Sequence, residues 1–126
     1  MTPKEKLVNL AFKYHSQGKL LEAAKEYQSF IDRGWKDARV FTNYALILNY
    51  IGKSKEAEVL GRKAIESKPD FPKAYCNLGI ILKDIGKLNE AETVIRKAIK
   101  LQENFAEAYC NLGIILKDMG NLEEAE

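Results

Sequence analysis

The sequence has little of the chemistry from which catalytic and metal sites are built. Its 126 residues include one histidine, two cysteines and one tryptophan. Charge of one sign is also scarce, because 20 lysines and arginines nearly balance 18 aspartates and glutamates. Proteins that bind nucleic acid usually present a strongly basic face, so we expect no nucleic-acid partner. Apolar runs such as residues 78–82 are far shorter than the ~20 residues of a membrane-spanning helix, so no membrane partner is expected.

The two cysteines are expected to be free thiols. Cys76 and Cys110 occupy equivalent places, 34 residues apart, in a repeat described below. Packed helices lie ~8–10 Å apart, whereas a disulfide needs Cα atoms within ~7 Å. Two thiols are too few for a zinc site, and His15 lies too far along the chain to activate either of them, so we expect no cofactor and no metal. The first residues lack the apolar stretch of a secretory signal, which favours the cytoplasm.

What the sequence does contain is an internal repeat. The stretch AYCNLGIILKD occupies residues 74–84 and again residues 108–118. Four other columns recur with the same period of 34 residues. They are Gly18, Gly52, Gly86 and Gly120; Asn9, Asn43, Asn77 and Asn111; Glu22, Glu56, Glu90 and Glu124; and Ala23, Ala57, Ala91 and Ala125. Four columns in phase predict an array of repeated structural units.

Each unit is predicted to form two helices. In the third unit, Tyr75, Leu78 and Leu82 follow the spacing of one helical face. Gly86 is expected to end this helix in a left-handed turn, and a second helix is expected from about Leu88. Similar patterns fill the first two units, and no strand pattern competes with them. The sequence therefore predicts an all-α fold.

The two ends of the chain carry different signals. At the start, Thr2, Pro3 and Glu5 make a plausible capping box with proline at the first helical position. At the end, the second helix of the fourth unit has barely begun when Glu126 is reached. Leu112 and Leu116 would then face a missing helix, which predicts self-association and a possible homo-oligomer through the incomplete repeat. We favour the alternative that the chain is a piece of a longer array.

These residues resemble the tetratricopeptide repeat (TPR), a helix–turn–helix unit of 34 residues. The resemblance rests on Tyr75-x-x-Leu78-Gly79-x-x-Leu82 followed by Gly86, Ala91 and Ala98. It implies a right-handed superhelical solenoid of antiparallel helix pairs, a single TPR array over residues 1–126. The repeats would span residues 4–37, 38–71, 72–105 and, in part, 106–126. In such solenoids the concave surface usually binds the partner.

A helical wheel places one stripe of each first helix opposite its packed face, on the predicted concave groove. An asparagine amide donates and accepts hydrogen bonds, so a column of asparagines can hold the backbone of an extended peptide. The run AYCNLG also resembles the TPR superhelix of O-linked N-acetylglucosamine transferases, where the resemblance implies such an asparagine ladder. The alternative is that the amides only bond neighbouring backbone. The predicted peptide-binding residues are Asn9, Asn43, Asn77, Asn111, Phe12, Leu46, Ile80, Ile114, Lys83 and Lys117.

We therefore predict a protein–protein interaction scaffold that binds an extended peptide and is not an enzyme. Two alternatives stay open: the substrate-recruiting region of a larger enzyme, such as a glycosyl- or sulfotransferase, and a self-assembling structural module. TPR proteins that clamp the C-terminal carboxylate of heat-shock chaperones carry a lysine and an asparagine where Val8 and Phe12 stand here, which argues against that type of ligand. Trp35 is interpreted as a packing residue at the first junction between repeats.

Overall fold

Seven α-helices account for most of the chain. The structure is a computed structural model that describes the backbone of residues 1–125 and the side chains of residues 1–121. The helices are α1 (Pro3–Ser16), α2 (Leu20–Asp32), α3 (Ala38–Tyr50), α4 (Ser54–Ser67), α5 (Pro72–Asp84), α6 (Leu88–Leu101) and α7 (Ala106–Ala125). No strand occurs among the described residues. None of the described helices is both long and apolar enough to cross a bilayer.

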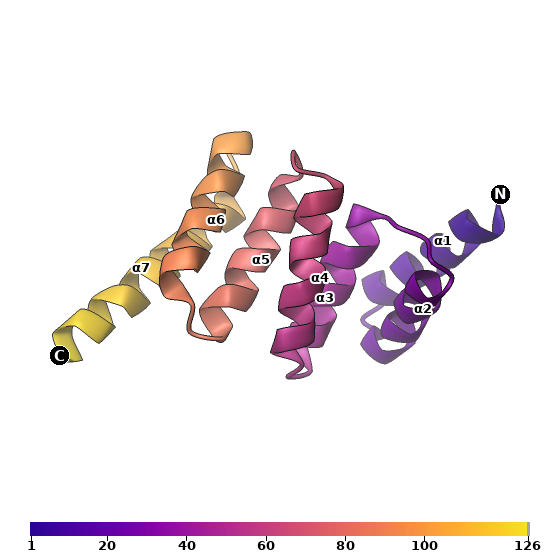
Figure 1. Ribbon diagram of the computed structural model, residues 1–126, viewed down its shortest axis with the longest axis horizontal. Helices are drawn as coiled ribbons and strands as arrows, with labels where there is room; N and C mark the ends of the chain where they lie inside the picture. Colours follow the sequence, from indigo (N-terminus) through magenta and orange to yellow (C-terminus); the bar gives the residue numbers. More distant parts are fainter. Residues whose placement is uncertain (126) are drawn as a thin grey trace.

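The helices stand in antiparallel pairs that follow one another along a row. Figure 1 shows α1 and α2 at one end, α3 with α4 and α5 with α6 in the middle, and α7 at the other end. Each pair packs on the next, and α5 contacts both of the neighbouring first helices, α3 and α7. The two termini lie at opposite ends of the row. The prediction of an all-α solenoid built from helix pairs is confirmed.

The local signals for helix ends act as the sequence predicts in the first three repeats. The Thr2 hydroxyl accepts a hydrogen bond from the Glu5 backbone N–H at 3.1 Å, and Pro3 opens α1. Helix α5 ends before Gly86, whose φ is +86°. The equivalent glycines of the first two repeats also have positive φ, with Gly18 at +75° and Gly52 at +91°. Glycine adopts this left-handed conformation without the steric cost that a Cβ would add.

The fourth repeat departs from the prediction at Gly120. Helix α7 runs without a break from Ala106 to Ala125, so Gly120 lies inside a helix and does not end one. Gly86 and Gly120 have equivalent places in the sequence but opposite roles in the structure. A turn at Gly86 is stabilised because the following helix, α6, packs back on α5. Within the described residues nothing packs back on α7 in that way, so helical hydrogen bonding continues through Gly120.

The core is divided into two apolar clusters that meet at α5. The first joins α1 to α5, and the second joins α5, α6 and α7. Helix α5 contributes Ile81 to the first cluster and Leu78 to the second, so its two sides serve different cores. Trp35 packs on the first cluster with its ring centroid 5.5 Å from that of Phe30, in agreement with its interpretation as a packing residue.

Ion pairs join the outer helices of the second and third repeats. The Glu58 carboxylate on α4 receives the Arg62 guanidinium at 2.8 Å and the Lys87 ammonium at 3.1 Å. Arg62 also pairs with Glu90 on α6. These groups are partly exposed, so each pair contributes only a fraction of 1 kcal/mol. Their main effect is to fix the register of one repeat against the next.

Candidate peptide-binding groove

The first helices present their predicted groove residues in register. Three polar contacts each join residues 34 or 35 positions apart on successive first helices. Asn49 donates to the Asp84 carboxylate at 2.7 Å, and Lys73 lies 3.8 Å from the Glu107 carboxylate. Equivalent residues of neighbouring repeats therefore lie side by side, as a groove lined by a repeating set requires.

The four asparagines do not share one environment. Asn9 is exposed, and its amide nitrogen lies 3.0 Å from the Met1 sulfur. Asn43 and Asn111 are half-buried, and Asn111 donates to the Cys76 sulfur at 3.5 Å. Asn77 is buried, with 2% of its surface exposed. A peptide backbone lying in the groove can reach the first, second and fourth amides more readily than the third.

Asn77 is nevertheless the asparagine with the strongest need for a partner. Neither its Oδ1 nor its Nδ2 has a hydrogen-bond partner among the described residues, and the same holds for the buried Oγ1 of Thr42 on α3. An amide that loses its water on burial without gaining a bond costs roughly 1–3 kcal/mol. A bound water or an inserted polar group would recover that free energy. The bonding to neighbouring backbone that was weighed as the alternative role is absent at this position.

The predicted apolar positions open toward one end of the groove. Phe12, Leu46 and Ile80 are half-buried, whereas Ile114 on α7 is 45% exposed. The predicted basic rim changes in the same direction. Lys83 is half-buried with its ammonium 3.1 Å from Asp84, and Lys117 is exposed. The part of the groove that is most accessible to an apolar side chain therefore lies on α7.

A hollow of about 570 Å³ lies at the other end, between the start of α1 and the start of α3. Burial alone would raise the pKa of Asp37, but hydrogen bonds from Arg39, with the charges of Arg39 and Lys4, bring that pKa below its usual value. Asp37 caps α3 through the Arg39 backbone N–H at 2.8 Å. The Arg39 guanidinium also lies over the Phe12 ring, 5.2 Å from its centroid. The hollow is lined by Thr2, Lys4, Glu5, Val8, Asn9, Asp37 and Arg39.

Sequence reasoning missed this hollow and its bound guanidinium. The available signal was Asp37 directly before a helix, since aspartate is a strong helix cap. Of the predicted site, only Asn9 lines the hollow. The opposed charges leave little net field, because Arg39 is already paired with Asp37.

A polar network supports the groove under the first repeat. His15 Nδ1 lies 2.9 Å from the Tyr27 hydroxyl, and Tyr27 is fully buried between the first two repeats. Burial, with a smaller contribution from the charge of Lys73, lowers the pKa of His15. Burial raises the pKa of Tyr27, while a hydrogen bond with Asn43 acts in the opposite direction. Asn43 therefore has a structural role in addition to the one predicted for it.

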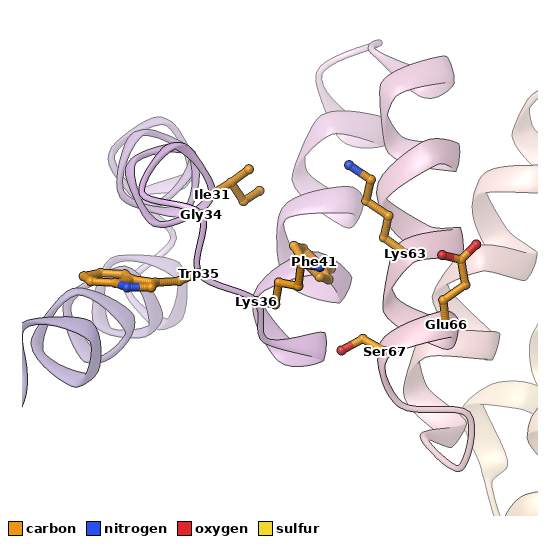
Figure 2. A pocket seen from close by; sticks show the side chains of 8 residues that line it. All are labelled: Ile31, Gly34, Trp35, Lys36, Phe41, Lys63, Glu66 and Ser67. Atoms are coloured by element: carbon orange, nitrogen blue, oxygen red, sulfur yellow. The ribbon is translucent and has the colours of Figure 1, made fainter.

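A second cleft, of about 470 Å³, opens away from the predicted groove (Figure 2). It lies where the first two repeats meet, with Phe41 of α3 and Ile31 of α2 among its apolar residues. Figure 2 shows the Trp35 ring directed away from Lys63 and Glu66, which stand on the far wall. The remaining lining residues are Gly34, Lys36 and Ser67. Among the described residues no three His, Cys, Asp or Glu side chains gather to hold a metal ion.

The two residues predicted for self-association differ in accessibility. Leu112 is 8% exposed because it packs in the second apolar cluster, whereas Leu116 is 43% exposed. Tyr109 on the same helix is 49% exposed. Both cysteines are free thiols, as predicted: Cys76 is buried, which raises the pKa of its thiol, and Cys110 is exposed.

Helix pairs stacked in one row, with their first helices in register, define the class of helical-repeat proteins. Residues 81–120 match the family described as TPR repeat, and residues 60–93 match the family described as tetratricopeptide repeat. The chain therefore contains tetratricopeptide repeats. No curated protein matches the sequence.

Solved TPR structures superimpose on nearly the whole chain. The first TPR of Spaghetti (RPAP3), bound to the HSP90 peptide SRMEEVD, is 26% identical with a TM-score of 0.85, over 93% of each chain. The first TPR domain of human RPAP3 is 26% identical with a TM-score of 0.87, over 98% of this chain and 97% of that one. The Sgt2 TPR domain of Aspergillus fumigatus is 19% identical with a TM-score of 0.87, over 99% and 85%.

Proposed function

We propose that this protein is an interaction scaffold that binds an extended peptide along the first helices of its repeats. The carrying observation is the groove face itself, which combines an exposed apolar anchor at Ile114 with partly accessible amides at Asn43 and Asn111. The peptide bound by the Spaghetti TPR, a structure of the same fold and length, supports peptide binding as the class of function. The repeats of this scaffold would be residues 4–37, 38–71, 72–105 and 106–126.

The proposed division of labour follows the chemistry of the lining. The amides of Asn9, Asn43 and Asn111 bond the peptide backbone, and Asn77 joins them where a peptide group enters to satisfy its unpaired amide. Phe12, Leu46, Ile80 and Ile114 select apolar side chains, while Lys83 and Lys117 stand at the rim. The protein binds its ligand without transforming it, and its free thiols suit the reducing cytoplasm.

The ligand that we propose is an apolar segment, not an acidic chain terminus. Val8 is buried and Phe12 is covered by Arg39, so neither position offers a cation or an amide to a carboxylate. Arg39 is itself neutralised by Asp37. Lys83 likewise pairs with Asp84. We therefore expect the HSP90 peptide SRMEEVD to bind more weakly than apolar peptides selected from a library.

The test is a peptide-library selection followed by fluorescence anisotropy with the best labelled peptide. We expect Ile114→Asp to weaken binding by tenfold or more, because a charge replaces the most accessible apolar anchor. An Asn43→Ala/Asn111→Ala double variant should weaken it further if the amides hold the backbone. The matched control is Val59→Asp, since Val59 is 56% exposed on α4, outside the first helices.

The outcomes separate the site from the rest of the surface. Equal binding by wild type, Ile114→Asp and the double variant would show that the first helices do not form the site. A loss with Val59→Asp alone would place the ligand on the second helices. If the chain belongs to a larger transferase, the same groove would recruit that enzyme's protein substrate, and a catalytic region would be encoded beside it.

A further inference from the structure

The face of α7 opposite its packed side has a sequence twin whose partner is known. Residues 74–84 of α5 and 108–118 of α7 are identical, so the two helices carry the same side chains in the same order. On α5 this face is covered by α6. The structure therefore shows, within one molecule, what kind of element fits a surface with this sequence.

The fit of α6 on α5 depends on one glycine. A Cβ added to Gly79 would lie 2.4 Å from Ile95 and 3.4 Å from Val94, so α6 crosses α5 where only hydrogen can stand. Ile95 is fully buried at this crossing. Ala91 and Ala98 flank it and are fully buried as well, and their small side chains let the two helices approach closely. The covering helix thus carries one large residue between two alanines.

The same seat on α7 is open. Nothing lies within 4 Å of a Cβ added to Gly113, the counterpart of Gly79. Tyr109 and Leu116, the counterparts of half-buried Tyr75 and fully buried Leu82, are 49% and 43% exposed. Exposed apolar residues of this size around a helical glycine mark a surface shaped for another helix.

We propose that α7 docks an amphipathic helix of a partner protein in trans, in the position that α6 takes on α5. The partner helix carries alanine, a β-branched pair and alanine at the spacing of Ala91, Val94–Ile95 and Ala98. This site lies on a different face from the peptide groove and does not depend on the function proposed for that groove. The other second helices show how narrow the specification is, because α2 has Tyr27 and Phe30 where α6 has Ile95 and Ala98.

The experiment uses the full chain and a labelled synthetic peptide of residues 87–102, which contains α6. We expect saturable binding by fluorescence anisotropy, with a gain of peptide helicity by circular dichroism. Gly113→Leu should weaken binding tenfold or more, because its side chain fills the place that Ile95 of the peptide needs. The variant should fold normally, since that space is empty in the free chain. Leu116→Asp serves as a second variant and should give the same loss.

Two peptides act as matched controls. A peptide of residues 19–33, from α2, should bind at least tenfold more weakly because its aromatic residues cannot enter the crossing. The 87–102 peptide with Ile95→Asp should fail in the same way. Binding of the wild-type peptide that Gly113→Leu and Leu116→Asp leave unchanged would overturn the proposal, as would no binding at all. Sedimentation that shows the chain alone forming oligomers, dispersed by Gly113→Leu, would assign the face to self-association instead.

Discussion

At the scale of single residues, the duplicated stretch separates what a side chain is from what it does. Gly79 and Gly113 are the same residue in the same local sequence, yet only Gly79 is needed for helix packing. Leu82 is fully buried whereas Leu116 is exposed, for the same reason. The role of each copy is decided by whether a second helix lies across it.

This contrast gives a paired stability prediction. Gly79→Ala should lower the free energy of unfolding by about 1–3 kcal/mol, because its Cβ forces Ile95 or α6 to move. Gly113→Ala should raise it by about 0.5–1 kcal/mol, because alanine is the better helix former and meets nothing. Urea denaturation followed by circular dichroism measures both. Equal effects of the two substitutions would contradict the close crossing at Gly79.

His15 gives a pH-dependent prediction at the same scale. Burial lowers its pKa in the folded protein, so the unfolded chain binds more protons as the pH falls through the ordinary histidine range. Its contribution to stability is therefore present above about pH 6.5 and is lost as the pH falls toward the lowered pKa. His15→Gln should flatten the stability profile between about pH 7.5 and 5. Asp37 and Glu58 have lowered pKa values and produce a separate loss at more acidic pH in both proteins.

At the scale of elements, α7 shows that a helix-ending signal needs a tertiary partner. Gly86 and Gly120 are preceded by nearly identical stretches, but only Gly86 turns the chain, because α6 then packs on α5. Before α7, from Phe105 back to α6, the chain turns in the same way as between α4 and α5. The exception is thus confined to the place where the returning helix is missing from the described chain.

The element-scale prediction compares these two glycines. Gly86→Ala should destabilise the protein by about 1–2 kcal/mol, since a residue with a Cβ is strained at a φ of +86°. Gly120→Ala should instead add about 0.5–1 kcal/mol to the stability of α7, because the helix passes through this position. Thermal denaturation and amide exchange of the α7 segment report the two effects. If Gly120→Ala destabilised the chain as Gly86→Ala does, α7 would have to turn at Gly120 in solution.

At the scale of the whole molecule, the repeat period was enough to predict the fold. Four columns in phase located the helix pairs, and the wheel placed Ile114 and Lys117 on an accessible face, where they are exposed. Burial within the stripe was not predictable, because it depends on how closely successive first helices approach. Asn77 is closed off for that reason, although its sequence context is identical to that of Asn111.

The first junction was the other part that escaped sequence reasoning. Trp35, Asp37 and Arg39 belong to no repeating column, so the period says nothing about them. Their contacts depend on the particular loop of residues 33–37, in which Gly34 has a φ of +79°. The hollow at Asp37 and the cleft beside Phe41 both arise there. Irregular sequence between regular repeats is where this chain carries features that periodicity cannot describe.

The row of helix pairs, with α5 shared between the two apolar clusters, also has a mechanical consequence. The termini lie at opposite ends of the row, so a pull on them acts on the interfaces one after another and not on a single closed core. Small rotations at each interface add up to a change in length, as in the coils of a spring. One 34-residue repeat that gave way would release about 115 Å of extended chain. Tethered between two partners, the protein is an elastic link whose extension occurs in steps of one repeat.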